Sequence, residues 1–164
     1  LLSSGGDGEV YVWDVRSRRC LSRFHNEGGT VTSSLACAGG AGVGYIAAGT
    51  ESGIVNVYDA AGLVRGAMTG APKPLRALSS LTTSVDRLCF NSVADAQILA
   101  MSSRRSKQAL RLAHLPSCTI FQNWPTASTP THFPSALAFS PDSRLFATGN
   151  DRGRALLYRL EHFS

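Results

Sequence analysis

The heptapeptide GEVYVWD at residues 8–14 provides a frame in which the rest of the chain can be aligned with itself. The same arrangement returns at 53–59 (GIVNVYD), 108–114 (QALRLAH) and 153–159 (GRALLYR), at offsets of 45, 55 and 45 residues. Each copy is a short run with apolar residues in alternation, as in a β-strand. Self-similarity at a fixed period of this size is typical of a repeat architecture.

Each repeat also contains the other short apolar runs of a four-stranded unit, bounded by glycine, aspartate, serine and proline. Glycine or aspartate in the turns before three of the heptapeptides suits tight hairpins. Together with a strand that ends in Trp-Asp, this pattern indicates an all-β WD40 β-propeller. Innermost strands are predicted at 31–37, 85–90 and 136–141, second strands at 45–49, 98–102 and 145–149, and outer strands at 19–25, 75–81 and 119–124.

We expect a C-terminal fragment of about three and a half four-stranded blades. The predicted boundaries are a partial blade at 1–28, blades at 29–82 and 83–126, and a last blade lacking its fourth strand at 127–164. The missing blades are expected upstream, and half a propeller alone is expected to be unstable because its end blades expose apolar faces. No Gly-His dipeptide occurs, so the usual His–Asp network of WD40 blades is predicted to be absent.

Composition describes a globular chain, with 43% hydrophobic residues and 16 glycines. The net charge is +5 and only Lys73 and Lys107 are lysines, so most cations are arginines, which suit phosphate and RNA. No apolar run is long enough for a membrane span. The cysteines lack a CxxC pair and are predicted to be buried apolar thiols in a nuclear or cytosolic protein: Cys20, Cys37, Cys89 and Cys118.

Two basic groups are the candidate contacts for RNA phosphate or an acidic partner: Arg16, Arg18 and Arg19 in one turn, and Arg104, Arg105 and Lys107, expected in the matching hairpin two blades on. A solvated turn is the alternative interpretation of both, and Arg152 and Arg154 form a weaker case. No aromatic residue interleaves with them, so a base-stacking platform is not predicted.

Aromatic residues have a different predicted role. Trp13, Tyr58 and Tyr158 occupy equivalent third-strand positions and are predicted to pack between blades. Trp124 is a further candidate surface contact, and the polar, proline-containing stretch 125–134 is a candidate docking loop.

Neither catalysis nor a cofactor or metal is predicted. The four histidines, His25, His114, His132 and His162, are isolated and not in metal-ligand spacing. No nucleophile elbow, P-loop or paired carboxylate motif occurs, and the glycine-rich stretch 39–42 lacks the lysine of a phosphate-binding loop.

Particular stretches resemble one family. They are 8–24 (GEVYVWDVRSRRCLSRF), 109–121 (ALRLAHLPSCTIF) and the C-terminal segments FATGN (146–150) and GRALLYRL (153–160). This combination resembles the C-terminal half of the U3 small nucleolar RNA-associated protein 18 family. The chain departs from the family pattern at 38–44 and 60–71, which are interpreted as surface loops.

The resemblance implies a non-catalytic scaffold of the small-subunit processome, which matures 18S ribosomal RNA in the nucleolus of the nucleus. Its implied partners are other processome proteins, with U3 and precursor ribosomal RNA bound indirectly or by arginine–phosphate contacts; neither a membrane nor a small-molecule substrate is implied. The alternative is a WD40 adaptor of another pathway, such as substrate recognition for a ubiquitin ligase, because the fold alone does not choose between them.

Overall fold

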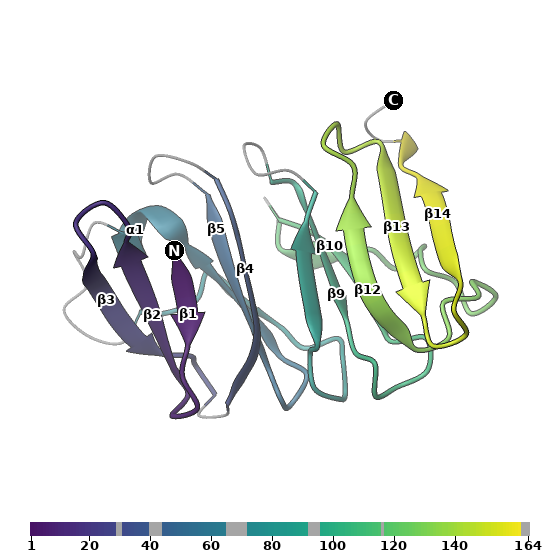
Figure 1. Cartoon of the computed structure of the whole chain (residues 1–164). Helices are drawn as coiled ribbons and strands as arrows, with labels where there is room; N and C mark the ends of the chain where they lie inside the picture. Colours follow the sequence, from purple (N-terminus) through teal and green to yellow (C-terminus); the bar gives the residue numbers. More distant parts are fainter. Residues whose placement is uncertain (29–30, 40–43, 65–71, 92–95, 116, 162–164) are drawn as a thin grey trace.

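Four antiparallel sheets stand side by side along the computed structural model, which describes residues 1–28, 31–39, 44–64, 72–91, 96–115 and 117–161 (Figure 1). Each sheet is a meander in which consecutive strands are neighbours. The sheets consist of β1 (Leu2–Ser4), β2 (Glu9–Asp14) and β3 (Arg19–His25); β4 (Thr32–Ala38), β5 (Tyr45–Thr50), β6 (Val55–Asp59) and β7 (Arg76–Leu78); β8 (Arg87–Phe90), β9 (Ile98–Ser102), β10 (Leu110–His114) and β11 (Thr119–Ile120); and β12 (Pro134–Phe139), β13 (Leu145–Asn150) and β14 (Ala155–Arg159).

The predicted all-β, bladed architecture is confirmed. The four repeated heptapeptides contain the third strands β2, β6, β10 and β14, and the last sheet has three strands within the described residues. The sheets do not close into a ring (Figure 1). Two outer strands are shorter than predicted, because β7 covers three residues and β11 only two.

The hydrophobic core lies between the sheets rather than within any one of them. Three clusters fill the three spaces, with Val10 and Tyr58 between the first and second sheets, Val57 and Leu99 between the second and third, and Leu110 and Phe146 between the third and fourth. Successive side chains of a strand point to opposite faces, so a strand with neighbours on both sides is buried on both. Every residue of β9 is accordingly buried.

A five-residue helix, α1 (Ala60–Val64), occupies the start of the stretch that was interpreted as a loop at 60–71. Asp59 caps it, since its carboxylate accepts the main-chain N–H groups of Ala61 (3.2 Å) and Gly62 (3.3 Å). The helix places Leu63 in the cluster between the first two sheets. It is too short to show a helical period in the sequence. Residues 65–71, and 40–43 of the other predicted loop, lie outside the described residues.

Trp13 corrects one expectation, because it does not pack between sheets as Tyr58 does. Tyr58 is 1% exposed, whereas Trp13 is 37% exposed, stacks on Tyr11 and donates from Nε1 to the Ser3 hydroxyl at 2.9 Å. The outer face of the first sheet has no neighbouring sheet in the described chain, so the same strand position that is buried in β6 is open in β2. At the other end, Leu157 is 67% exposed for the same reason.

The expectation of buried cysteines is wrong for two of the four. Cys20 and Cys37 are exposed, while Cys89 and Cys118 are half-buried. Cys20 lies on the outer strand of the uncovered first sheet, and Cys37 lies on the innermost strand β4, whose burial is incomplete along its length. Burial raises the pKa of the Cys89 and Cys118 thiols.

Polar contacts between the first two sheets use asparagine and tyrosine. The amide Nδ2 of Asn56 and the hydroxyl of Tyr58 both donate to Oδ1 of Asn26, at 2.8 and 2.9 Å. The Tyr58 hydroxyl also accepts the N–H of Glu27 at 3.1 Å. Buried polar groups are stable only when paired, so this network links the end of the first sheet to β6.

Tyr58→Phe is expected to lower the free energy of unfolding by about 1–2 kcal/mol, because it leaves the Glu27 N–H and the Asn26 oxygen each short of one partner. Urea unfolding of the full-length protein measures this loss. Tyr45→Phe is the matched control, because the half-buried Tyr45 has no hydroxyl hydrogen bond with the described residues. Equal losses in both variants would show that the hydroxyl network contributes nothing.

Candidate functional site

The first basic group lies in the turn between β2 and β3. Asp14 shapes this turn, since its carboxylate accepts the N–H of Arg16 (3.0 Å) and the hydroxyl of Ser17 (2.7 Å). These bonds, that from Ser17 first, lower the pKa of Asp14. Arg16, Arg18 and Arg19 are all exposed, and none forms an ion pair with a described residue. The turn therefore presents three guanidinium groups to solvent.

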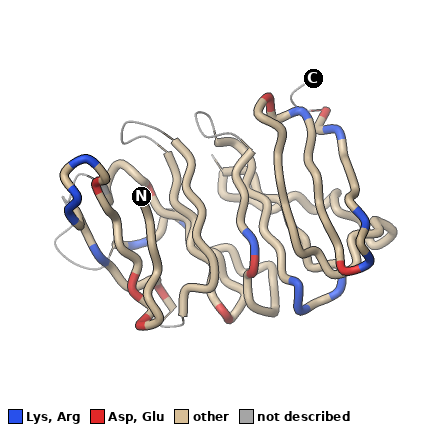
Figure 2. The backbone as a smooth tube through the Cα atoms, viewed as in Figure 1, with Lys and Arg blue, Asp and Glu red and all other residues tan. Residues whose placement is uncertain are grey.

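The second basic group does not occupy the matching hairpin. Arg104, Arg105 and Lys107 lie between β9 and β10, the second and third strands of their sheet, whereas the first group lies between a third and an outer strand. Successive turns of a meander alternate between its two ends. The two groups therefore lie at opposite ends of the sheets (Figure 2) and cannot form one continuous patch.

The members of the second group are not equivalent. Arg104 is paired, with Nε 3.7 Å from Oδ1 of Asp86 and its main-chain N–H donating to Oδ2 of the same carboxylate at 2.8 Å. Arg105 and Lys107 are exposed and form no ion pair with the described residues. The corresponding turn of the last sheet adds the exposed Arg152 and Arg154.

Acidic and basic residues are unevenly distributed at the end of the sheets that carries the β9–β10 and β13–β14 turns. The β1–β2 and β5–β6 turns, which correspond to the two basic turns just described, carry Asp7 and Glu51 instead. In Figure 2 the lower end of the first two sheets is mostly acidic, whereas at the lower end of the last two the basic residues outnumber the acidic ones, which include Asp86 and Asp151. A polyanion is therefore attracted to the third and fourth sheets at this end.

Trp124 contributes mainly to packing. Its ring meets the rings of Phe146 and Tyr158 edge-on, at centroid distances of 5.9 and 4.9 Å, and it is half-buried. The candidate docking loop that follows is only partly exposed, because Thr129 and Thr131 are buried. Trp124 thus remains a candidate contact only through the exposed part of its side chain.

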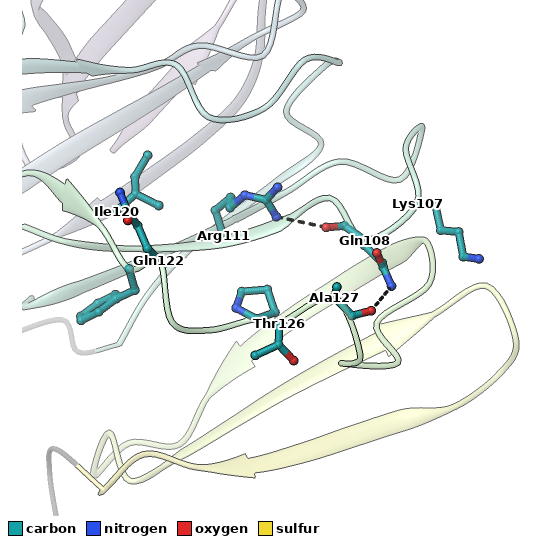
Figure 3. A pocket seen from close by; sticks show the side chains of 9 residues that line it. Lys107, Gln108, Arg111, Ile120, Gln122, Thr126 and Ala127 are labelled. Carbon is teal, nitrogen blue, oxygen red and sulfur yellow. Dashed lines mark hydrogen bonds between the residues drawn. The ribbon is translucent and has the colours of Figure 1, made fainter.

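A pocket of about 440 Å³ lies at the outer side of the third sheet, beside this loop (Figure 3). In Figure 3, Ile120 and Gln122 lie on one side of it, Gln108 and Lys107 on the other, and Thr126 and Ala127 below Arg111. The complete lining is Lys107, Gln108, Arg111, Ile120, Phe121, Gln122, Pro125, Thr126 and Ala127.

Sequence reasoning missed this pocket. Phe121 is ten residues from Arg111 along the chain, yet the antiparallel pairing of β10 with β11 brings both to the same pocket, beside Lys107. An aromatic residue distant in the sequence thus lines the same pocket as Lys107, a member of the second basic group. The available signal was Gln108, which stands where the other three repeats have Gly8, Gly53 and Gly153.

Within the described residues, no three histidine, cysteine or acidic side chains come together as a group that could hold a metal ion. Nor does any described helix have the length and apolar character that crossing a membrane requires.

Comparison with known proteins supports the repeat architecture described above. The family model "WD domain, G-beta repeat" matches residues 124–158, which run from the loop after β11 to the third strand of the last sheet. This stretch is therefore a WD40 repeat, as the repeated heptapeptides predict. The crystal structure of the computationally designed Ika4 protein has a TM-score of 0.70 with 15% identity, covering 97% of this chain and 84% of that one, which supports the fold alone.

Relatives of this WD40 chain include three proteins of one name. It is 45% identical over 163 residues to "U3 small nucleolar RNA-associated protein 18 homolog" of Arabidopsis thaliana, covering 99% of this chain and 28% of that protein. The human homologue is 44% identical, again over 99% of this chain and 28% of the relative. "U3 small nucleolar RNA-associated protein 18" of Saccharomyces cerevisiae is 38% identical, over 99% and 29%. The chain therefore spans less than a third of these relatives, and the resemblance seen in the sequence is confirmed.

Proposed function

We propose that the chain is part of a non-catalytic WD40 scaffold subunit of the U3 ribonucleoprotein in the small-subunit processome, acting in 18S ribosomal RNA processing in the nucleolus. The observation that carries this proposal is the identity of 38–45% over 99% of the chain to proteins named as U3 small nucleolar RNA-associated. A generic propeller would share the blade pattern without such identity over nearly the whole chain.

The surface agrees with this assignment in charge. The β2–β3 turn exposes three guanidinium groups that have no ion pair among the described residues, and the opposite end of the third and fourth sheets exposes Arg105, Lys107, Arg152 and Arg154. Arginine forks match phosphate oxygens in geometry and keep their charge at all physiological pH values. Other processome proteins, and U3 and precursor ribosomal RNA, are the proposed partners of these surfaces.

Crosslinking and immunoprecipitation of the tagged full-length protein, with sequencing of the bound RNA, tests the proposal. We expect U3 RNA and precursor 18S RNA to be enriched over a precipitation from cells that lack the tag. Recovery of protein partners without these RNAs would instead indicate a WD40 adaptor of another pathway.

A triple substitution, Arg16→Gln, Arg18→Gln and Arg19→Gln, separates direct from indirect contact in the same experiment. Loss of crosslinks with retained co-precipitation of U3 RNA indicates that this turn touches phosphate while protein partners hold the complex together. Because these side chains are exposed and have no ion pair among the described residues, the substitution is expected to leave the fold intact.

A further inference from the structure

The outer strand of the third sheet ends early and leaves part of β10 without a neighbour. β11 pairs only with Ala113 and His114, and the last bond to β10 is from the N–H of Phe121 to the carbonyl of Leu112, at 2.9 Å. In the first sheet, by contrast, β3 pairs along the whole of β2. The pocket lies where the outer strand would have continued past Gln108 and Arg111.

Arg111 takes the place of the missing strand. Its Nη1 donates to the carbonyl oxygens of Leu110 (2.7 Å) and Gln108 (3.1 Å). Alternate carbonyls of a strand face the same edge, so these two point towards the absent neighbour, at the edge where the Leu112 carbonyl still bonds to Phe121. The guanidinium satisfies them and opposes the addition of a foreign strand. Its Nη2 and Nε have no hydrogen bond with the described residues and remain available in the pocket, held in place by the two bonds from Nη1.

Gln108 builds the opposite wall. It adopts a φ of 58°, in the left-handed region, at the position where the other repeats have glycines with φ of 83°, 91° and 68°. Its N–H donates to the carbonyl of His132 at 2.6 Å, and its Nε2 donates to the carbonyl of Ala127 at 2.8 Å. A glycine would adopt this φ more readily, but it would lack the side-chain hydrogen bond to Ala127 in the loop. Strain retained with such a contact is typical of functional positions.

The lining selects a ligand with both an anionic and a flat apolar part. Lys107 and Arg111 supply positive charge, and no carboxylate is among the lining residues. Ile120, Phe121 and Pro125 supply apolar surface, and Gln108 and Gln122 carry amide groups that can donate and accept. A volume of about 440 Å³ is within the range of small-ligand sites.

The surroundings favour RNA over an acidic protein segment. Arg105, Arg152 and Arg154 are exposed on turns at the same end of the third and fourth sheets, which suits a chain of phosphates more than a single carboxylate. We propose that the pocket receives one nucleotide of a single-stranded RNA, with the phosphates on its two sides on Lys107 and Arg111 and the base against the apolar residues. This inference rests on the proposed function and names the RNA form and the residues that bind it.

Fluorescence anisotropy with the full-length protein tests this inference, using a labelled single-stranded RNA of about ten nucleotides as the probe. Lys107→Gln and Arg111→Gln are each expected to weaken binding roughly fivefold or more and to reduce the salt dependence of log affinity by about 0.7 per lost phosphate contact. Lys107 is exposed and has no hydrogen bond among the described residues, so its variant keeps the test valid if Arg111→Gln disturbs the strand edge.

Arg144→Gln is the charge-matched control. Arg144 is exposed in the β12–β13 turn, at the opposite end of the sheets, and the substitution removes the same single charge. The control is expected to bind the probe like the wild type. The same RNA annealed into a duplex is expected to bind more weakly and to be insensitive to the pocket variants, because a paired base cannot enter.

Unchanged affinity for single-stranded RNA in both pocket variants would overturn the inference, as would absence of RNA binding by the full-length protein. Either result leaves the proposed function to the crosslinking experiment, in which U3 RNA can still be recovered through protein partners. Binding of an acidic peptide that both pocket variants abolish, with RNA binding unaffected, would assign the pocket to a protein segment instead.

Discussion

Gly53→Ala is expected to lower the free energy of unfolding by about 3–5 kcal/mol. Gly53 is buried in the β5–β6 turn with a φ of 91°, and a Cβ there would overlap the carbonyl of Leu81 and lie 3.0 Å from the carbonyl oxygen of Thr83. The positive φ alone costs a non-glycine residue about 1–2 kcal/mol. The overlap adds to this cost because backbone, unlike a side chain, cannot rotate away.

Gly153→Ala is the matched control for this prediction. Gly153 occupies the equivalent turn of the last sheet with a φ of 68°, but it is exposed and a Cβ there would meet nothing within 4 Å. Its loss should be about 1–2 kcal/mol, the conformational cost alone. Urea unfolding of the full-length protein and both variants measures the difference. Similar losses at the two turns would contradict the close approach of the 81–83 connection to Gly53.

The two glycines also show which features of the structure the local sequence pattern can predict. A repeated glycine or aspartate between alternating apolar runs is enough to predict three of the four β5–β6-type turns, because the backbone of a tight hairpin requires it. The contact between Gly53 and Leu81 involves a connection to the next sheet, and no feature near residue 53 encodes it. Turn positions were therefore predictable, whereas the severity of a substitution was not.

The second strands of the sheets were predictable from the sequence because they are buried. β5 and β9 are buried on both faces, so they are continuous apolar runs that stand out from their surroundings. Outer strands have one neighbour only and weaker patterns, so the predicted strand at 119–124 shrinks to Thr119–Ile120. Trp13 illustrates the remaining limit, because its burial depends on which sheet lies beside it rather than on its own strand.

The candidate site likewise has features that the local sequence predicts and features that it does not. Arginines in a turn are exposed by their position, and the structure finds Arg16, Arg18 and Arg19 exposed as expected. Which end of a sheet a turn occupies depends on strand order. Because Arg104 was assigned to a hairpin between a third and an outer strand, the two basic groups were expected in matching hairpins. The pocket depends on an absent stretch of outer strand, which alignment of repeats shows only indirectly, through Gln108 in place of glycine.

Asn91→Ala is expected to cost about 3–5 kcal/mol of unfolding free energy, comparable to the effect at Gly53. Asn91 follows β8 and is 3% exposed. Its Oδ1 accepts the N–H groups of Gln97 (3.0 Å) and Ile98 (2.9 Å), while its Nδ2 donates to the hydroxyl of Ser143 at 3.1 Å. Alanine removes all three bonds, and each buried group left without a partner costs about 1–3 kcal/mol.

Ser143→Ala separates the two roles of Asn91. The Ser143 hydroxyl, in the β12–β13 turn, also donates to the carbonyl of Asn91 at 3.0 Å, so it joins the third and fourth sheets but takes no part in the bonds from Asn91 to Gln97 and Ile98. Its loss should cost about 1–2 kcal/mol, leaving the bonds to Gln97 and Ile98 intact.

Asn123→Ala, at an exposed asparagine without a hydrogen bond among the described residues, should change the unfolding free energy by less than about 0.5 kcal/mol. A loss at Asn91 no larger than that at Ser143 would mean that the asparagine only connects the sheets. A larger loss means that it also closes its own turn, so that one side chain stabilises both a blade and its contact with the next.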